Sequence, residues 1–570
     1  MSEEARFYWI AGAAGASVLA ILWTTGALAG ALFGSGWAPI RLDQLLFAAV
    51  RLPSHLGSPR EAWPRGVARG LPGPIGFYAA FGLVLTATTA IAWLAKGGVD
   101  RLGFGIPSLG GERRPPSAKM ASRRDLRLLR VPSPQPGRLT LGRRGGMLLA
   151  AEERQSVIVF SPTQTFKTTG FAIPALLEWE GPVLATTVKN DLIADTLARR
   201  QSLGKVAIFD PTHATDIPRS RISPLWGATT WPGAVRVGRW LMSAARLSRS
   251  SGMQDADFWF AAAEKLVAPL LFAAAANGET MEAVIRWLDE GPEASEVEVT
   301  ELLRETGVAE ARRQWQATLN REERQRSSIY TTAEIALAAF ADPNVLEETA
   351  GADYTPSMLF DGGANTLFLS APRMEQGRLR SLFSAFVQEH LWLAESLFAA
   401  TEKPLDPPWL LLLDEAANTA PVPHLEQVAA TGAGQGIQLL SIFQDFSQGE
   451  GVYGPAFSSV VNNHAAKIIG SGISDRKTTA FFSGVIGTGR FEQKSRTAAE
   501  KGRSSTTEGE TYRDLAPPSA LRETRPGTGH LVYRHLRATN FSLRPWFEER
   551  KLKELRRASS GPNRGKGGEA

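Results

Sequence analysis

Two long stretches without charged residues lie near the start of the chain. The first, Phe7 to Gly34, exceeds the roughly 20 residues that an apolar helix needs to cross a bilayer, and the second runs from Ile75 to Ala95. Continuous apolar character of this length predicts membrane helices at about 7–34 and 75–95. We therefore expect residues 1–102 to form a two-helix transmembrane hairpin.

The first stretch has a second interpretation, a cleavable signal. Such a signal has an apolar core of about 7–15 residues behind a basic start, whereas this stretch is longer and follows Glu3 and Glu4. The membrane anchor is favoured. Gly26, Gly30 and Gly34 recur every four residues, which indicates either a face for close helix packing or a helix that merely tolerates glycine.

Basic residues flank both stretches. They are denser after the second stretch than in the loop between the two, which favours a cytoplasmic C-terminal side, although the arginines of the loop weaken this rule. Residues 103–150 are basic and rich in Gly and Pro, and they predict a linker. The composition of the tail, residues 556–570, predicts disorder.

Beyond residue 150, short apolar runs alternate with segments of helical period. The predicted strands are Val157–Phe160, Pro182–Thr187, Lys205–Asp210, Thr366–Ser370, Leu410–Asp414, Ile437–Phe443, Ala466–Gly470 and His530–Tyr533. This alternation predicts an α/β body, residues 151–230 and 350–555, with a mostly parallel sheet covered on both faces. Residues 231–349 carry Ala-rich helical segments without a strand pattern, which predicts an inserted all-α domain.

Composition excludes several kinds of chemistry. The chain has 570 residues and no cysteine, so disulfides, Cys-ligated zinc and thiol nucleophiles are excluded. Its 7 histidines show no metal-binding spacing, and no G-x-S-x-G motif is present. The net charge of +6 is a mild basic excess.

The stretch SVIVFSPTQTFKTTG, residues 156–170, has the layout of a phosphate-binding loop. An apolar strand breaks at Ser161 into a polar loop, and Lys167 and Thr168 then open a helix, whose N-terminus attracts anions. The usual pattern is G-x-x-x-x-G-K-[ST], but Ser161 and Phe166 replace its two glycines. By itself this match fits an ordinary strand–loop–helix junction equally well. The candidate nucleotide-binding residues are Thr163, Gln164, Thr165, Phe166, Lys167, Thr168 and Thr169.

A second stretch, PWLLLLDEAANTAP at 408–421, is an apolar strand that ends in Asp414 and Glu415. In a nucleotide hydrolase the first carboxylate holds the magnesium shell and the second deprotonates the attacking water. Another apolar strand ends at Gln444, where a polar group can contact the γ-phosphate. A strand that leads into a polar turn is the alternative, but the combination with the K-T-T loop favours a nucleotide hydrolase.

At this point the sequence resembles the conjugative coupling ATPases of type IV secretion systems, the TraG/TraD-like proteins. The resemblance rests on the order of SPTQTFKTTG, TTVKNDL, FDPTHAT, SPLW, DFWFAAAEKLVAPLL, LLLLDEAANTAPVPHLEQVAATGAGQGIQLLSIFQDFSQ and VVNNHAAKIIGSGISD, from the membrane hairpin to about residue 550. It implies a RecA-like P-loop nucleotide-binding domain with an all-α insertion, anchored as a multi-pass protein in the bacterial cytoplasmic (inner) membrane with its soluble domain in the cytoplasm.

The resemblance also implies a function. Such proteins form hexameric rings, use ATP and Mg²⁺, bind DNA with little sequence preference, recruit a relaxase–DNA complex and deliver it to the secretion channel. Transferred to this chain, Lys167 and Thr168 bind phosphate and magnesium, Asp414 binds magnesium, Glu415 is the catalytic carboxylate and Gln444 the catalytic sensor. Lys189, with Asp191 near it, occupies a strand tip beside the nucleotide.

Two departures bear on hydrolysis. Many members of the family have an arginine shortly before the Gln444 strand, and this arginine is a candidate to contact the nucleotide of the neighbouring subunit. This chain reads ATGAGQG there, so such an arginine finger would come from elsewhere, for example Arg476 or Arg513. Phe166 stands where the backbone normally requires glycine. Three other functions therefore stay open: a coupling ATPase that exports only protein effectors, a double-strand DNA pump, and a docking scaffold with little hydrolysis. The absence of a separate DNA-reading domain after residue 550 disfavours the pump.

Overall fold

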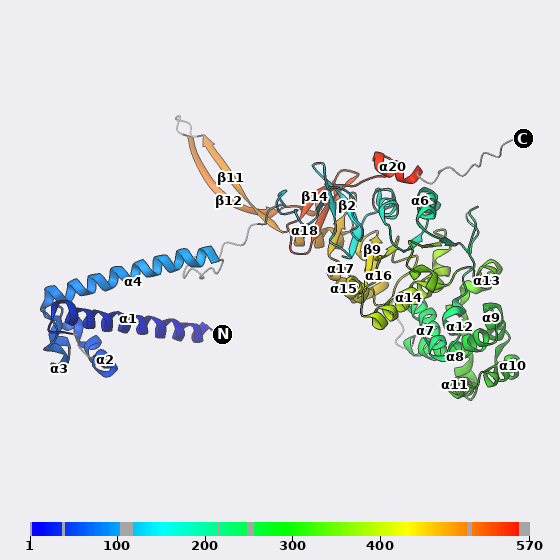
Figure 1. The fold of residues 1–570 in the computed structure, drawn as a ribbon, viewed down its shortest axis with the longest axis horizontal. Helices are drawn as coiled ribbons and strands as arrows, with labels where there is room; N and C mark the ends of the chain where they lie inside the picture. The colour runs from blue at the N-terminus through cyan, green and yellow to red at the C-terminus, as the bar shows by residue number, and fades with distance from the viewer. Residues whose placement is uncertain are drawn as a thin grey trace, which may run out of the picture. The chain divides into compact units, whose positions relative to one another are not determined.

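The structure is a computed structural model of the full chain, and it describes residues 3–36, 40–102, 118–214, 216–247, 256–498 and 504–557. The chain divides into two compact units, which comprise residues 1–115 and 116–570. Figure 1 shows their elements, and each unit is considered separately below.

The first unit is helical. Its long helices α1 (Glu3–Phe33) and α4 (Pro74–Leu102) pack against each other, and the segment between them forms α2 (Leu42–Arg51), two 3₁₀ turns (Leu52–Ser54 and Pro59–Ala62) and α3 (Arg65–Ala68). A small core holds the unit together, with Trp63 and Phe77 as its largest buried side chains. A Cβ atom on Gly34 would lie 2.1 Å from the carbonyl oxygen of Gly70. The glycine face of α1 therefore packs closely against the connecting segment of its own chain.

The predicted transmembrane hairpin is not confirmed. Among the described residues, one helical segment is long and apolar enough to cross a membrane, Asp257–Ala276, and 67% of its window is buried inside the second unit. The apolar helical segments of the first unit, Ser17–Phe33 and Pro74–Thr89, are shorter. The side chains of residues 7–16 and 90–95, which belong to the two predicted spans, lie outside the description. Membrane anchoring thus remains a proposal.

The second unit is built around a sheet of twelve strands. Its parallel part runs in the spatial order β10 (Ala466–Ile469), β4 (Val157–Phe160), β9 (Ile437–Phe443), β8 (Trp409–Leu413), β5 (Val183–Thr187), β7 (Thr366–Ser370) and β6 (Val206–Phe209). The predicted parallel strands are therefore confirmed to within one residue at each end. Strand β13 (Thr528–Tyr533) then pairs antiparallel with β10 and begins the other part of the sheet.

Both faces of the sheet are buried, as the near-continuous apolar strands require. Alternate residues of β4 belong to two different cores: Val157 and Val159 pack with α5 (Ile173–Glu178) and α6 (Asn190–Leu203), whereas Ile158 and Phe160 pack with the helices of the opposite face. That face is covered by α14 (Gln376–Thr401), α15 (Leu425–Gln435), α16 (Phe446–Tyr453), α17 (Phe457–Asn463) and α18 (Arg476–Ile486).

The described part of residues 231–349 consists of helices joined by short turns. They form α7 (Trp231–Leu247), α8 (Ala256–Ala276), α9 (Met281–Asp289), α10 (Gly291–Glu305), α11 (Ala309–Leu319), α12 (Glu323–Ala336), a 3₁₀ turn and α13 (Pro343–Thr349). These helices gather at one end of the unit (Figure 1). Their apolar residues share a continuous core with the sheet, so the boundaries of a separate all-α domain stay a prediction.

The predicted linker is wrong from residue 130 onward. Strands β1 (Arg130–Val131), β2 (Thr140–Arg144) and β3 (Met147–Ala150) form the outer antiparallel part of the sheet, where β2 pairs with β14 (Thr539–Ser542). The glycines that suggested a linker instead allow a tight hairpin turn and close packing between strands. Gly145 and Gly146 turn the β2–β3 hairpin with positive φ, and a Cβ on Gly142 would collide with the Phe541 ring. Residues 103–117 lie outside the description.

Two further segments complete the unit. Strands β11 (Thr488–Ala498) and β12 (Ser504–Asp514) pair as a separate antiparallel ribbon, which the sequence analysis missed because its residues are mostly polar. Helix α19 (Pro518–Arg522) follows this ribbon. The C-terminal helix α20 (Arg550–Arg557) packs on α5 and α6 and includes two residues of the predicted disordered tail. Residues 558–570 lie outside the description.

Candidate functional site: a phosphate loop facing two acids

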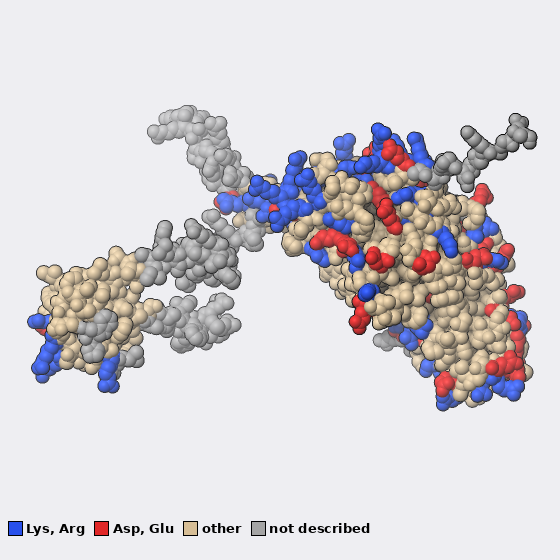
Figure 2. All heavy atoms as spheres, viewed as in Figure 1, with Lys and Arg blue, Asp and Glu red and all other residues tan. Residues whose placement is uncertain are grey.

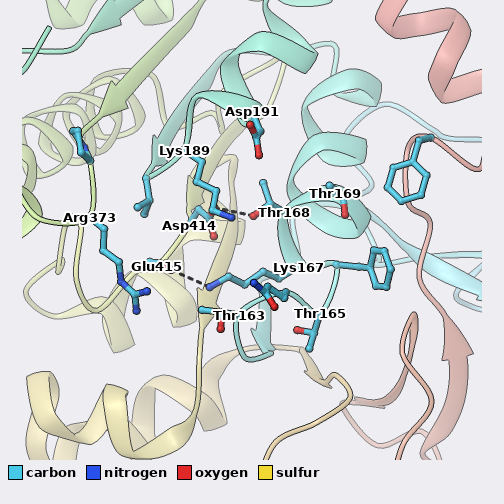
Figure 3. A pocket seen from close by; sticks show the side chains of 15 residues that line it. Thr163, Thr165, Lys167, Thr168, Thr169, Lys189, Asp191, Arg373, Asp414 and Glu415 are labelled. Atoms are coloured by element: carbon cyan, nitrogen blue, oxygen red, sulfur yellow. Dashed lines mark hydrogen bonds and ion pairs between the residues drawn. The ribbon is translucent and has the colours of Figure 1, made fainter. Parts of the chain in front are cut away.

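A cavity of about 560 Å³ opens where β4, β5, β7 and β8 end (Figure 3). It is lined by Thr163, Gln164, Thr165, Phe166, Lys167, Thr168, Thr169, Val188, Lys189, Asp191, Pro372, Arg373, Asp414, Glu415 and Phe547. Every predicted nucleotide-binding and metal-binding residue lies in this lining. Parallel strands present their carboxyl ends at one edge of a sheet, which is why segments far apart in sequence meet there.

The loop after β4 is held by local hydrogen bonds. The hydroxyl of the buried Ser161 and that of the half-buried Thr165 share a hydrogen bond of 2.5 Å, and Thr165 also donates to the Pro162 carbonyl oxygen at 2.6 Å. Gln164 and Phe166 have left-handed backbones, with φ of 62° and 63°. Alternation of left-handed residues in a loop turns backbone N–H groups toward one side and makes an anion-binding concavity. The loop therefore adopts phosphate-loop geometry without its glycines.

Lys167 and Thr168 start the following helix and face the two acids at the end of β8. The ammonium Nζ of Lys167 lies 3.1 Å from Oε1 of Glu415, and Thr168 Oγ1 donates to Oδ2 of Asp414 at 3.3 Å. The Lys167 and Glu415 side chains are less than a tenth exposed. In the absence of other charges, Lys167 is the cation that compensates the buried carboxylates.

The two carboxylates are incompletely satisfied. Oδ1 of Asp414 and Oε2 of Glu415 are buried and accept no hydrogen bond within the described part of the chain. The pKa of Asp414 is raised to about 6, mainly because the group is buried; Lys167 opposes this rise, and nearby Glu415 contributes to it. Buried acceptors without partners cost stability unless a cation or a donor joins them. The arrangement is thus shaped to receive a positively charged group.

Strand order explains how these acids are positioned. Strand β8 lies between β5 and β9, and Thr186 on β5 donates through its hydroxyl to the Asp414 carbonyl oxygen at 3.2 Å. Gln444, at the end of β9, donates from Nε2 to Oε1 of Glu415 at 3.4 Å. Glu415 itself has a left-handed backbone, with φ of 54°. The predicted sensor and the predicted catalytic carboxylate are therefore in contact, although Gln444 does not line the cavity.

Several cavity residues escaped the sequence analysis. Arg373 lies on the loop after β7, is exposed, and points toward the same space as Lys167 and Lys189 (Figure 3). It follows an apolar strand by three residues, so the strand-tip position that drew attention to Lys189 would have identified it as well. Neither proposed finger, Arg476 or Arg513, lines this cavity.

The C-terminal segment forms one wall of the cavity. The ring of Phe547 lies 6.2 Å from that of Phe166, and the Trp546 backbone N–H donates to the Thr169 carbonyl oxygen. The buried Arg544 anchors this wall through the carboxylates of Glu178 and Glu549, at 2.7 and 2.8 Å. No motif in the sequence pointed to this contact, because about 380 residues separate Phe547 from Phe166.

Fold and site together define an α/β protein with a helix-covered sheet and, at the ends of its parallel strands, a loop of phosphate-binding layout that faces two buried acids. A family model described as type IV secretory system conjugative DNA transfer matches residues 120–526. The chain belongs to this family.

Individual relatives agree with this assignment. The chain is 24% identical to the conjugal transfer protein TraG of Agrobacterium fabrum over 61% of this chain and 53% of that protein, and 25% identical to VirD4 of Rhizobium rhizogenes over 62% and 52%. It thus matches about half the length of these curated relatives. The coupling protein TrwB in complex with ADP and Mg²⁺ has a similar fold, with a TM-score of 0.55 and 16% identity over 77% of this chain and 97% of that chain. TrwB has also been solved with a non-hydrolysable ATP analogue, at 17% identity.

Proposed function

We propose that this protein is a membrane-anchored coupling ATPase that recruits a relaxase–DNA complex and delivers DNA to a type IV secretion channel. The observation that carries the ATPase part is the buried Lys167–Glu415 pair beside Thr168 and Asp414, at the mouth of a cavity lined by the phosphate loop. Membership in the conjugative DNA transfer family supports the DNA cargo.

The residues fit ATP with Mg²⁺. Mg²⁺ prefers oxygen ligands and is usually held by one or two protein groups together with phosphate oxygens. Thr168 Oγ1 and the unsatisfied Oδ1 of Asp414 supply such oxygens, and the described residues contain no cluster of three or more His, Asp or Glu that would hold a metal alone. TrwB binds ADP with Mg²⁺ and an ATP analogue, which supports the same cofactors here.

Each side chain has a role in this proposal. Lys167 leaves Glu415 and holds the outer phosphates, while the loop N–H groups face the phosphate oxygens. Glu415, once released, accepts the proton of the attacking water, and Gln444 holds Glu415 and reports the γ-phosphate. Thr168 and Asp414 would hold magnesium, which would supply positive charge beside the phosphate oxygens. Lys189 adds a further cation at the rim of the cavity.

Assembly and anchoring extend the proposal. We infer a homo-oligomer, most simply a hexameric ring, anchored in the bacterial inner membrane by the apolar segments of α1 and α4, with the second unit in the cytoplasm. The large apolar side chains exposed on these helices, such as Trp23, Leu32 and Phe81, support contact with lipid. A full-length chain that leaves membranes in a carbonate wash would contradict the anchor.

A docking scaffold with little hydrolysis is the second candidate. It is favoured by one observation, the left-handed backbone of Phe166 at the loop position where glycine is expected. Export of protein effectors instead of DNA would use the same site and differ only in its cargo.

The test is ATP binding and DNA-stimulated ATP turnover of the full-length protein in detergent, with two variants that separate the roles of the acids. In Glu415→Gln, ATP binding should persist while turnover falls by at least about a hundredfold, because the general base is lost. In Asp414→Ala, binding in the presence of Mg²⁺ should weaken as well.

Three results would contradict the proposal. Equal turnover in Glu415→Gln and the parent would remove Glu415 from the mechanism. ATP binding without measurable turnover in the parent would favour the scaffold. Turnover that a relaxase or an effector protein stimulates, and DNA does not, would favour protein cargo.

A further inference from the structure

A second cavity lies in the first unit, far in sequence from the phosphate loop. It has a volume of about 680 Å³ and is formed by the segment between α1 and α4. Its lining includes Phe47, Arg51, Arg60, Trp63, Arg65 and Arg69. The phosphate-loop mechanism uses none of these residues.

The charge around this cavity is strongly unbalanced. Among the described residues, four arginines line it together with one acid, Glu61. No carboxylate among the described residues pairs with Arg60, Arg65 or Arg69, whereas arginines of the second unit such as Arg143, Arg286 and Arg378 have such partners. Figure 2 shows that the basic side chains of this unit gather at the end where α2 and α3 lie, while the rest of its described surface is largely uncharged.

Unpaired like charges around one cavity repel one another and attract an anion. Arginine is suited to a phosphate, because its planar guanidinium makes paired hydrogen bonds to two oxygens. Arg65 begins α3, and Arg69, four residues on, caps its C-terminal end, so both lie on one side of that helical turn. The chemistry of the cavity is therefore that of a phosphate group.

Apolar side chains beside the cavity identify the source of that phosphate. Leu46, Phe47 and Val50 of α2 are 49%, 44% and 81% exposed, although Leu45 and Ala48 already supply the face of α2 that packs in the core. The Arg51 guanidinium lies 5.0 Å over the Phe47 ring, so a charged group and an apolar group adjoin at the cavity rim. A helix with exposed apolar residues next to cationic ones is typical of the boundary between lipid headgroups and acyl chains.

We propose that this cavity binds the phosphate headgroup of an anionic phospholipid, while Leu46, Phe47 and Val50 contact its acyl chains. The arginines of the loop between the two long helices then line a lipid site, which explains why they weaken the charge asymmetry expected of a membrane hairpin. This inference rests on the proposed membrane anchoring and is independent of the ATPase activity.

The experiment uses the full-length protein in nanodiscs of phosphatidylcholine with or without phosphatidylglycerol. Native mass spectrometry measures the phosphatidylglycerol that each chain retains, and ATP binding is measured on the same samples. Arg65→Gln should lower phosphatidylglycerol affinity roughly tenfold, because a charge-assisted hydrogen bond is lost. Arg65→Lys, which keeps the charge and loses the planar fork, should retain an intermediate affinity.

Arg41→Gln is the matched control, since Arg41 lies in the same loop and outside the cavity lining. Its phosphatidylglycerol retention should equal that of the parent. Equal retention in Arg65→Gln and Arg41→Gln, or no preference of the parent for phosphatidylglycerol over phosphatidylcholine, would overturn the proposal. Inorganic phosphate that displaces phosphatidylglycerol at equal concentration would assign the cavity to a free anion and overturn the lipid source. A parent protein that retains phosphatidylglycerol as expected but does not bind ATP would contradict the proposed ATPase function and leave the lipid site supported.

Discussion

Phe166 shows how one residue can hold a loop in a conformation that its side chain disfavours. Its φ of 63° lies in the left-handed region, where a non-glycine residue pays about 1–2 kcal/mol. Its ring packs near Phe547 and against the core on one face of the sheet. Contacts of the Phe166 ring with the C-terminal segment therefore offset part of the strain in the Phe166 backbone.

Comparison of two variants separates strain from packing. Phe166→Ala removes the ring and keeps the strained backbone, whereas Phe166→Gly removes both. We expect Phe166→Gly to bind ATP about tenfold more tightly than Phe166→Ala, since about 1.4 kcal/mol corresponds to a factor of ten. We also expect Phe166→Gly to bind ATP more tightly than the parent. Titration of a fluorescent nucleotide against the three proteins measures both differences.

Each outcome has a distinct meaning. Equal affinity of the glycine and alanine variants would show that the backbone carries no strain relevant to binding. Weaker binding by both variants than by the parent would show that the ring contact with Phe547 outweighs the strain. Lys167→Ala serves as the control for loss of phosphate contact.

At the scale of elements, the junction between α14 and the helical insertion contains a buried acid. Glu389 of α14 is 3% exposed, and its Oε1 accepts no hydrogen bond within the described residues. A Cβ on Gly227 would lie 2.3 Å from that oxygen, so only glycine leaves room for it. Burial raises the pKa of Glu389 to about 8, and Arg236 opposes the shift.

This raised pKa predicts a dependence of stability on pH. The folded protein keeps Glu389 protonated up to about pH 8, whereas the unfolded chain releases that proton near its usual pKa of about 4.3. The stabilisation that Glu389 contributes is fully present below the unfolded-state pKa and is lost as pH rises toward 8. The free energy of unfolding falls by up to about 1.4 kcal/mol per pH unit. Burial lowers the pKa of His390 to about 4, so its stabilisation depends on pH in the opposite direction: it is fully present above about pH 6.5 and is lost as pH falls toward 4.

The window from about pH 7 to 8 therefore isolates Glu389. Glu389→Gln should flatten the fall in the unfolding temperature across this window, because a neutral amide does not titrate. Differential scanning fluorimetry of the parent and the variant at matched ionic strength measures the two slopes. Identical slopes would remove Glu389 as their origin. The buried Tyr354, whose pKa is raised by burial, titrates well above this range.

The elements also show what a sequence can and cannot predict. Strands such as β4, β7 and β9 were predicted at their observed bounds, because strands buried on both faces are continuous apolar runs. Strands β2 and β14 were missed because each is short and mixes polar with apolar residues, and their pairing depends on partners distant in sequence. The β11–β12 ribbon has no apolar alternation, so only its pairing defines it.

The candidate site, like the sheet, could be predicted only in part. Asp414 and Glu415 are recognisable because they follow an apolar strand, and Lys167 and Thr168 because they open a helix after a strand and a polar loop. The wall formed by Phe547 was not predictable, since no local pattern links the C-terminal segment to the phosphate loop.

For the whole molecule, the proposed DNA motor should contact mainly phosphates. No base-reading module is evident in the sequence, and the net charge is +6. Affinity for duplex DNA should fall by about 0.9 log units per log unit of salt for each phosphate neutralised, with little dependence on base sequence. Fluorescence anisotropy with two unrelated duplexes across a salt series measures both properties. Affinity that ignores salt, or that favours one duplex strongly, would contradict this prediction.

The pairing of β2 with β14 has a consequence for biosynthesis. Arg143 lies opposite Ser542, so the outer part of the sheet joins residues made at the beginning and the end of the second unit. Translation at about 5–20 residues per second separates the emergence of these partners by roughly 20–80 s. During that interval the β2–β3 hairpin leaves the ribosome with an unpaired edge, which is a template for aggregation. A chaperone that binds nascent chains should therefore protect this edge until the C-terminal strand is made.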